Sequence, residues 1–380
     1  MPRPPVRSLS LVGAFLVLLG SGNARAQEAG PESVAAVAQE SALQARVDGI
    51  AQRALRTGRL AGFSIAVSQG DEMLVEGGWG HAHIELEVPA TAGTVYRIGS
   101  ITKQFTAAAI MRQVELGRID LDASMTEYLP DFDTQEHDVG MRHLLRHTSG
   151  IKSYTGLPSF WQNASAHLSH EELVDTFEAL PFDFAPGEEF RYNNSGYYLL
   201  GMIVEKVGGA RYEDVLRQEF FEPLEMTRTC YGWNQPIIKG RASGYSLEEG
   251  KLVNCKHMSM SAPGGAGALC STVGDLVRWN RGLAERTVVD EDSYEQMTTA
   301  GTLNNGDAHS YGFGLMIGEL PDGRPLISHG GGIFGFSSHL LCVPDEDLSI
   351  AVLTNTGGAD PGAISRQILR AVLSSPGKTP

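Results

Sequence analysis

The sequence predicts an α+β fold, in which an antiparallel sheet is flanked by N- and C-terminal helices and carries an inserted, mostly helical subdomain. Strand patterns that bracket short turns occur near both ends of the chain. The middle, about 120–283, is rich in helix signals and in Gly, Pro and Ser loops. With 380 residues and 42% hydrophobic content, the chain can bury a large core. We therefore expect one domain over residues 27–380, with its sheet part at about 27–119 and 284–380.

The first elements of this domain are a helix and a hairpin. Residues 32–57 contain few helix breakers, and their apolar residues recur at helical spacing, which predicts a helix with one packed face. The strand patterns at 63–67 and 73–77 flank the turn Gln69–Asp71. A turn between two such patterns predicts a β-hairpin.

Two further hairpins and a second helix are predicted near the other end. The first hairpin pairs residues 314–319 with 325–328, and the second pairs 336–343 with 348–354. An amphipathic pattern over 363–374 predicts the closing helix. The strands at the two ends of the chain therefore join in one antiparallel sheet.

The N-terminus has the features of a bacterial signal peptide. Arg3 and Arg7 precede the apolar run Leu9–Gly20, and the segment Ala24–Ala26 supplies small residues at the positions that a signal peptidase reads. We expect cleavage after Ala26 and an exported protein, either periplasmic or secreted. The apolar run is too short for a stable span, so we expect no stable membrane anchor.

Charge and cysteine content limit the partners. The formal net charge of −15 disfavours nucleic acid and anionic membranes. We therefore expect a small molecule or a short peptide as the partner, and the sequence leaves the oligomeric state open.

The chain has four cysteines, Cys230, Cys255, Cys270 and Cys342. An oxidising compartment permits one or two disulfides among them, and three full pairings are possible. Free thiols are an equal alternative.

The stretch from Ser100 to Lys103 is the most informative of the chain, because it combines a nucleophile with its own base. It stands before the helix-forming run 104–115. A helix that begins at Ser100 brings the Lys103 amine, three residues on, to the same face as the Ser100 hydroxyl. The unpaired backbone N–H groups of the helix start favour negative charge there. The S-x-x-K pattern is short and common, however, and taken alone it favours a capped surface helix with a solvated lysine over a catalytic pair.

Two later motifs reverse that balance. Tyr192 and Asn194 form Tyr-x-Asn, and His329 begins His-x-Gly on a predicted strand. Ser-x-x-Lys, Tyr-x-Asn and Lys/His-x-Gly in this order resemble the class C β-lactamase and penicillin-binding-protein superfamily of serine hydrolases, of the peptidase family S12 type. Segments 144–151, 271–279 and 311–315 also resemble this family. The resemblance covers nearly all of the chain after the signal peptide and implies a β-lactamase/transpeptidase-like fold.

The resemblance also implies a role for each candidate residue. Ser100 is the expected nucleophile, and the Lys103/Tyr192 pair is the expected base, with the first proton acceptor left open between the two. Asn194 is expected to bind the substrate carbonyl and to accept from the Lys103 amine. The glycines Gly330, Gly331 and Gly332 allow close approach of a ligand, and the N–H of Gly332 is expected to complete an oxyanion hole with that of Ser100.

His329 departs from true class C β-lactamases, which carry lysine at this position. A histidine is mostly neutral at pH 7, so it does not supply the fixed charge that helps to bind a β-lactam carboxylate. The His-x-Gly form is more similar to the D-aminopeptidase, D-peptidase and esterase-like branches. We therefore expect an exported serine hydrolase of amide or ester bonds, with D-amino-acid-containing peptides as substrates. The alternatives are a β-lactamase, an esterase or acyltransferase, and a penicillin- or peptidoglycan-binding protein that does not turn over.

Other histidines invite a metal reading that we do not favour. His81 and His83 share a strand face, and His137, His143 and His147 lie close together in the sequence. Neither group includes the carboxylate or cysteine that would complete a recognisable ligand set. We expect solvated or core histidines, no metal and no cofactor.

Overall fold

The computed structural model describes residues 31–374, with side chains described from Ser41 onward. The predicted signal peptide, residues 1–26, lies outside this range. From Gln39 onward the described chain forms one compact unit. Within residues 31–374, none of the helices combines the length and the apolar character that crossing a membrane requires.

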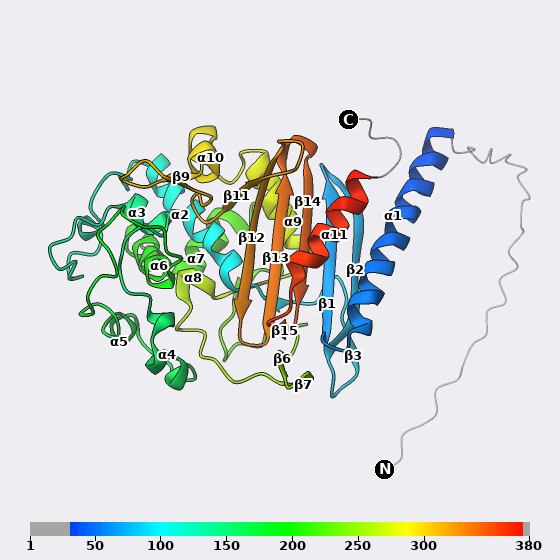
Figure 1. The fold of residues 1–380 in the computed structure, drawn as a ribbon, viewed down its shortest axis with the longest axis horizontal. Coiled ribbons are helices and arrows are strands. Elements are labelled where there is room, and N and C mark those ends of the chain that lie inside the picture. The colour runs from blue at the N-terminus through cyan, green and yellow to red at the C-terminus, as the bar shows by residue number, and fades with distance from the viewer. Residues whose placement is uncertain (1–30, 375–380) are drawn as a thin grey trace, which may run out of the picture. The chain divides into compact units, whose positions relative to one another are not determined.

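A seven-stranded sheet forms the centre of this unit (Figure 1). Its strand order is β11-β12-β13-β14-β1-β2-β3, and each neighbouring pair is antiparallel. This arrangement confirms the predicted α+β fold with a sheet built from both ends of the chain. The strands are β1 (Gly62–Gln69), β2 (Glu72–His83), β3 (Val88–Pro89), β11 (Met316–Glu319), β12 (Pro325–Ile333), β13 (Phe336–Val343) and β14 (Leu348–Thr354).

The pairing of β1 with β14 joins the two ends of the chain. Its register runs from Phe63 opposite Thr354 to Gln69 opposite Leu348. The three predicted hairpins are confirmed as β1–β2, β11–β12 and β13–β14. The strand β12, however, continues to Ile333, five residues beyond its predicted end. The added residues include Gly330, Gly331 and Gly332. Glycine is a poor strand former, but pairing with β13 holds these three residues in the sheet.

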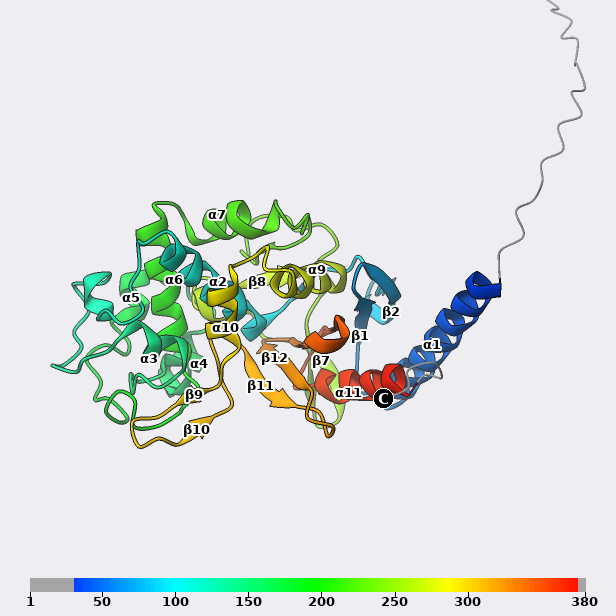
Figure 2. The ribbon, with the colours of Figure 1, turned by 90° about the horizontal axis from the view of Figure 1, so that it is seen from above.

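Helices cover both faces of the sheet. Helix α1 (Pro31–Arg56) and helix α11 (Pro361–Leu373) match the two predicted flanking helices. The described part of α1 and helix α11 pack against Ile350 and Val352 of β14. Helix α9 (Val273–Ala284) lies on the other face, where Ala351 and Leu353 point. Figure 2 shows α9 and α11 on opposite sides of the strands. The alternation along β14 therefore supplies two cores, because successive strand residues face opposite sides.

The remaining helices gather beside the sheet around a second, larger core. They are η1 (Gly99–Ile101), α2 (Thr102–Glu115), η2 (Met125–Glu127), α3 (Met141–Leu145), η3 (Tyr154–Gly156), α4 (Pro158–Asn163), α5 (His170–Val174), α6 (Asn194–Gly208), α7 (Tyr212–Leu216), η4 (Arg217–Phe221), α8 (Gly264–Gly267) and α10 (Glu291–Thr298). Most of them come from the middle of the chain. The short turn η5 (Pro344–Glu346) instead connects β13 to β14. The division of the domain at residues 119 and 283 stays a prediction, and α9, at the end of that middle segment, packs on the sheet.

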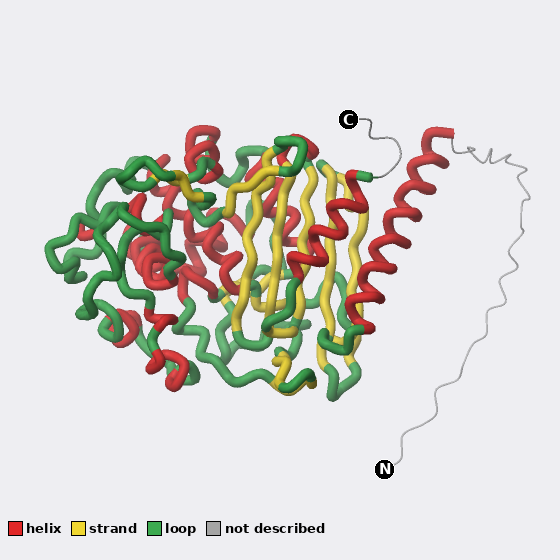
Figure 3. The backbone as a smooth tube through the Cα atoms, viewed as in Figure 1, coloured by secondary structure: helices red, strands yellow, loops and turns green. Residues whose placement is uncertain are grey.

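Three small sheets, shown in yellow in Figure 3, complete the fold. They contain β4 (Tyr96–Arg97), β8 (Leu269–Ser271) and β5 (Cys230–Tyr231); β15 (Thr356–Gly357), β6 (Tyr245–Glu248) and β7 (Lys251–Asn254); and β9 (Gly301–Thr302) with β10 (Ala308–His309). The sequence did not predict these strands, since two to four residues are too short to show an alternating pattern. The four cysteines are free thiols in the structure.

Candidate active site

Ser100 lies in the turn η1, which directly precedes α2. The predicted helix start at Ser100 is therefore a single 3₁₀ turn, and the α-helix itself begins at Thr102. This turn lies against β12. A Cβ atom on Gly331 would overlap the carbonyl oxygen of Ile98, and one on Gly99 would lie 2.9 Å from the Gly332 nitrogen. Glycine at these positions lets the backbone of β12 approach the serine turn closely.

Lys103 is fully buried on the first turn of α2. Its Nζ lies 3.2 Å from Ser100 Oγ, 2.8 Å from Asn194 Oδ1 and 2.8 Å from the carbonyl oxygen of Ala266. The structure therefore brings together three residues that the sequence proposed for one site. The Ala266 carbonyl belongs to α8, which no sequence pattern singled out.

Burial holds the pKa of the Lys103 amine well below its usual range. The contacts of Nζ suit the neutral form. A neutral amine has two N–H groups and one lone pair. In the neutral form, the two N–H groups donate to Asn194 Oδ1 and the Ala266 carbonyl oxygen at 2.8 Å, and the lone pair is then left to accept from the Ser100 hydroxyl at 3.2 Å. In this form, the amine can accept the serine proton directly.

Tyr192 lies in the loop before α6, with 39% of its surface exposed. Its ring centroid is 4.7 Å from Lys103 Nζ. Burial of the phenol raises the pKa of Tyr192, and a hydrogen bond with Ser100 opposes the rise. Because part of the side chain stays exposed, water offsets some of this desolvation. The phenol is therefore protonated at neutral pH, which suits it to donate a proton and not to accept one first.

Asn194 is the first residue of α6. The helix starts here because the Asn193 side chain caps it, accepting a hydrogen bond from the Gly196 N–H at 3.1 Å. The Asn194 amide nitrogen donates to Thr155 Oγ1 at 2.9 Å. That bond leaves the amide oxygen directed at Lys103, so the orientation of the amide is fixed on both sides.

His147, which the sequence analysis considered only as a metal ligand and expected to be a solvated or core histidine, is buried beside the site. Its backbone oxygen accepts from the Arg191 N–H at 3.0 Å, and its Nδ1 accepts from the Asn193 N–H at 3.1 Å. Its ring centroid lies 4.3 Å from that of Tyr192. One buried histidine therefore holds both neighbours of Tyr192. Burial holds the pKa of His147 well below its usual range. Its place in the family-like segment 144–151 was the available signal.

His329 occupies β12 but has its ring nitrogens engaged within the protein. Its Nδ1 is 2.6 Å from the Gly330 carbonyl oxygen, which only accepts, so Nδ1 carries the proton. Its Nε2 accepts from the Tyr311 hydroxyl at 2.9 Å. The residue is 2% exposed, and burial lowers its pKa to about 3. His329 is therefore neutral at pH 7 and supplies no fixed charge.

A cavity of about 160 Å³ opens beside Ser100. Asn194 and Gly332 also line it, whereas His329, Gly330 and Gly331 are not among its lining residues. The larger part of its wall is apolar. That part comprises the side chains of Tyr154, Phe160, Trp161, Met258, Ile333 and Phe334. Among the described residues that line the cavity, none carries a formal charge.

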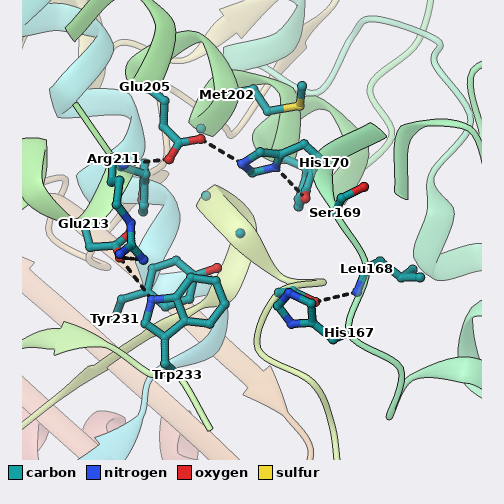
Figure 4. Close-up of a pocket in the computed structure, with 16 residues that line it drawn as sticks. His167, Leu168, Ser169, His170, Met202, Glu205, Arg211, Glu213, Tyr231 and Trp233 are labelled. Carbon is teal, nitrogen blue, oxygen red and sulfur yellow. Dashed lines mark hydrogen bonds and ion pairs between the residues drawn. The ribbon is translucent and has the colours of Figure 1, made fainter. Parts of the chain in front are cut away.

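A larger cavity, of about 290 Å³, lies on the other side of α8 (Figure 4). It contains none of the candidate catalytic residues. Its charged groups are paired with one another or with its aromatic wall: His170 Nε2 lies 2.8 Å from Glu205, and Trp233 Nε1 donates to Glu213 at 3.1 Å. The rings of Trp233 and Tyr231 stack, with centroids 4.2 Å apart. A cavity of about 480 Å³ beside Leu129 and Phe132 is larger still, and it also contains none of the candidate catalytic residues.

The histidines considered as metal ligands find other partners. His83 Nδ1 lies 3.2 Å from Glu85, His143 Nδ1 accepts from the Gly140 N–H at 3.1 Å, and the ring of His137 packs 4.4 Å from that of Phe182. Within residues 31–374, no three His, Cys, Asp or Glu side chains are grouped so that they could hold a metal ion.

The sheet with its adjoining helices, and a buried lysine beside a serine, are those of the penicillin-binding-protein-like serine hydrolases. The Beta-lactamase family model matches residues 43–374, so the chain belongs to that family.

Two curated relatives agree with this assignment. The chain is 31% identical over 327 residues to D-aminopeptidase of Gluconobacter oxydans, which covers 83% of this chain and 59% of that protein. It is 28% identical over 313 residues to penicillin-binding protein 4* of Bacillus subtilis, which covers 77% of this chain and 67% of that protein. The chain thus spans 59% to 67% of the length of these relatives.

Solved structures confirm the fold class. D-amino acid amidase from Ochrobactrum anthropi SV3, in complex with L-phenylalanine amide, has a TM-score of 0.77 at 25% identity, covering 89% of this chain and 99% of that one. The octameric penicillin-binding protein homologue from Pyrococcus abyssi has a TM-score of 0.76 at 29% identity, covering 87% and 77%.

Proposed function

We propose that this protein hydrolyses amide or ester bonds through an acyl-enzyme on Ser100, with D-amino-acid-containing peptides as its substrate class. The observation that carries the proposal is the buried Lys103 amine, whose pKa is lowered and whose Nζ lies 3.2 Å from Ser100 Oγ. The similarity to a D-aminopeptidase and to a D-amino acid amidase supports the substrate class.

Acylation divides the work among four residues. Ser100 Oγ attacks the substrate carbonyl carbon while its proton passes to the neutral Lys103 amine. The N–H groups of Ser100 and Gly332 stabilise the oxyanion, a contribution of about 3 kcal/mol for each donor. Tyr192 then donates its phenol proton to the leaving group as the carbonyl–leaving-group bond breaks, and regains a proton from the Lys103 ammonium. The Ser100 ester remains.

Deacylation reverses the proton path. Water attacks the ester carbon, the Lys103/Tyr192 pair accepts its proton, and Ser100 Oγ leaves and is reprotonated. The acid product then dissociates. The Asn194 amide oxygen accepts from Lys103, and its amide nitrogen donates one N–H to Thr155. The second N–H of the amide nitrogen then donates to the substrate carbonyl.

Export is part of the proposal. The charged start, apolar run and Ala24–Ala26 site at the N-terminus support secretion across a bacterial membrane with cleavage after Ala26. N-terminal sequencing of the protein recovered from the periplasm or the medium tests this point. A mature chain that begins at any residue other than Gln27 would contradict the cleavage site.

The neutral His329 makes a β-lactamase the weaker alternative. A β-lactam carboxylate would find no fixed positive charge at this residue, because the pKa of His329 is lowered to about 3. An esterase or acyltransferase, and a protein that is acylated without turning over, would use the same Ser100 and Lys103.

Turnover of three substrate types by the purified chain tests the proposal. They are D-amino-acid p-nitroanilides, short-chain p-nitrophenyl esters and a chromogenic cephalosporin, and Ser100→Ala is the control. We expect turnover of the first two types by the wild type alone, with a covalent adduct on Ser100 detected by mass spectrometry. An adduct without turnover would support the trapping alternative. Equal activity of the wild type and Ser100→Ala would contradict the Ser100 mechanism.

A further inference from the structure

The cavity beside Ser100 is closed by two stacked aromatic side chains from distant parts of the chain. Trp161 comes from α4, and Phe334 lies in the turn between β12 and β13. Their ring centroids are 5.6 Å apart, with an angle of 15° between the planes. We call this Trp161–Phe334 pair the aromatic clamp. It joins the helical region to the β12–β13 turn, and both rings line the same cavity as Ser100.

The clamp is held in place by its neighbours. The Trp161 indole N–H donates to the Thr155 carbonyl oxygen at 2.9 Å. Its ring meets that of Phe160 at 5.1 Å, and Phe160 meets the buried Tyr154 at 5.0 Å, both edge to face. The rings of Phe160 and Tyr154 therefore support Trp161, one partner of the clamp. Trp161 still has 53% of its surface exposed, so a ligand can reach its ring face.

The wall of this cavity favours apolar, uncharged ligands. Apolar groups gain free energy by leaving water for such a wall, and flat aromatic groups gain further from stacking. A charged group would lose its hydration without finding an opposite charge, because the described residues that line the cavity are all uncharged. The nearest ionisable amine, Lys103, has a lowered pKa and is directed to Ser100, Asn194 and Ala266.

We propose that this cavity receives the side chain of the acyl group and that the aromatic clamp selects uncharged aromatic side chains over small ones and over charged ones. The inference rests on the proposed Ser100 hydrolysis, because the acyl group is the part of the substrate that becomes attached to Ser100. In the terms of that proposal, the expected substrates carry an aromatic, D-phenylalanine-like residue on the acyl side of the bond that is cleaved.

Matched p-nitrophenyl esters test the selection. All of them release p-nitrophenolate, so only the acyl group differs. We expect kcat/KM for the phenylacetate to exceed that for the acetate by tenfold or more, on the order of the discrimination that apolar pockets achieve. Of two esters with similar shape, the 4-methylphenylacetate should be preferred over the 4-carboxyphenylacetate by about 100-fold, since the carboxylate has no partner in the cavity.

Three variants assign the preference to the clamp. Trp161→Ala and Phe334→Ala should each reduce the phenylacetate-to-acetate ratio of kcat/KM to near one. The double variant should add little to either, because the two rings act as a unit. Trp233→Ala removes a stacked aromatic residue from the cavity of about 290 Å³ and should retain the wild-type ratio. Comparing ratios within each variant removes differences in the amount of folded protein.

The outcomes separate this inference from the proposed function. Turnover of acetate and phenylacetate with equal kcat/KM, or clamp variants that keep the wild-type ratio, would overturn the inference while the Ser100 hydrolysis stood. Efficient turnover of the 4-carboxyphenylacetate would also overturn it. Absence of any Ser100-dependent turnover would remove both the proposed function and the inference.

Discussion

The pH dependence of stability gives a direct test of the charge state of Lys103. In the folded protein, burial lowers the pKa of this amine well below its usual range, whereas in the unfolded chain the amine titrates near about 10.4. Between these two values, the unfolded state binds one proton more than the folded state. The free energy of unfolding must therefore rise with pH, and Lys103→Met, which has no titratable group, should lack this contribution.

The size of the effect follows from linkage. One proton contributes about 1.36 kcal/mol per pH unit, so the wild type should gain about 2.7 kcal/mol over the variant between pH 7 and pH 9. The full gain applies over the part of this range that lies above the lowered folded pKa of Lys103. Burial lowers that pKa, and the polar atoms that contact Nζ belong to Ser100, Asn194 and Ala266, none of which is a carboxylate. Methionine has a similar length and adapts well to irregular sites.

Urea unfolding at pH 7, 8 and 9 measures this difference. Lys251→Met, on the exposed strand β7, controls for the loss of one lysine from the chain. Parallel pH curves for the wild type and Lys103→Met would refute the reasoning. They would mean that the folded Lys103 is an ammonium with three acceptors, and the role of first proton acceptor would then pass to Tyr192.

Three other variants test the supports of the site. His147→Ala should lower kcat more than it changes KM, because it removes the side-chain contacts that hold Tyr192 and Asn193 in the loop before α6. Steady-state kinetics on a p-nitrophenyl ester measure both constants, and an unchanged kcat would contradict the positioning role. Gly331→Ala should destabilise the protein by several kcal/mol, because the new Cβ atom would overlap the Ile98 carbonyl oxygen. The control Gly318→Ala on β11 places its Cβ no closer than 3.7 Å to any neighbour. Thermal unfolding should therefore occur at a clearly lower temperature for Gly331→Ala than for Gly318→Ala. Tyr311→Phe should cost about 1–3 kcal/mol, since it leaves His329 Nε2 buried without its donor, and an unchanged urea midpoint would argue against that hydrogen bond.

Local patterns were sufficient for much of the fold. The strands β13 and β14 have the bounds that the sequence predicted, because two apolar runs flank the charged turn 344–347. The approach of Lys103 to Ser100 is similarly local. Residues three apart share a helix face, and the 3₁₀ turn that replaces the first helical turn keeps Nζ 3.2 Å from the hydroxyl.

Contacts between distant segments were beyond such patterns. Nothing in the sequence around Trp161 indicates that Phe334 stacks on it, since the two meet only when α4 is placed beside the β12–β13 turn. The burial of His147 and His329 has the same origin, because each becomes buried only when loops and strands from elsewhere close over it. The continuation of β12 through Gly330–Gly332 depends on its partner β13, whose register overrides the weak strand preference of glycine.

The pairing of β1 with β14 also determines when this protein can become active during synthesis. A ribosome makes β1 first and β14 last among the strands of this sheet, so the central pair forms only after the other six strands have been made. Contacts of such high sequence separation form slowly. A nascent chain that stops before β12 already carries Ser100, Lys103 and Tyr192 but not the strand against which the serine turn lies. The surroundings of Ser100 are therefore complete only in a chain that includes β12 and its partner β13.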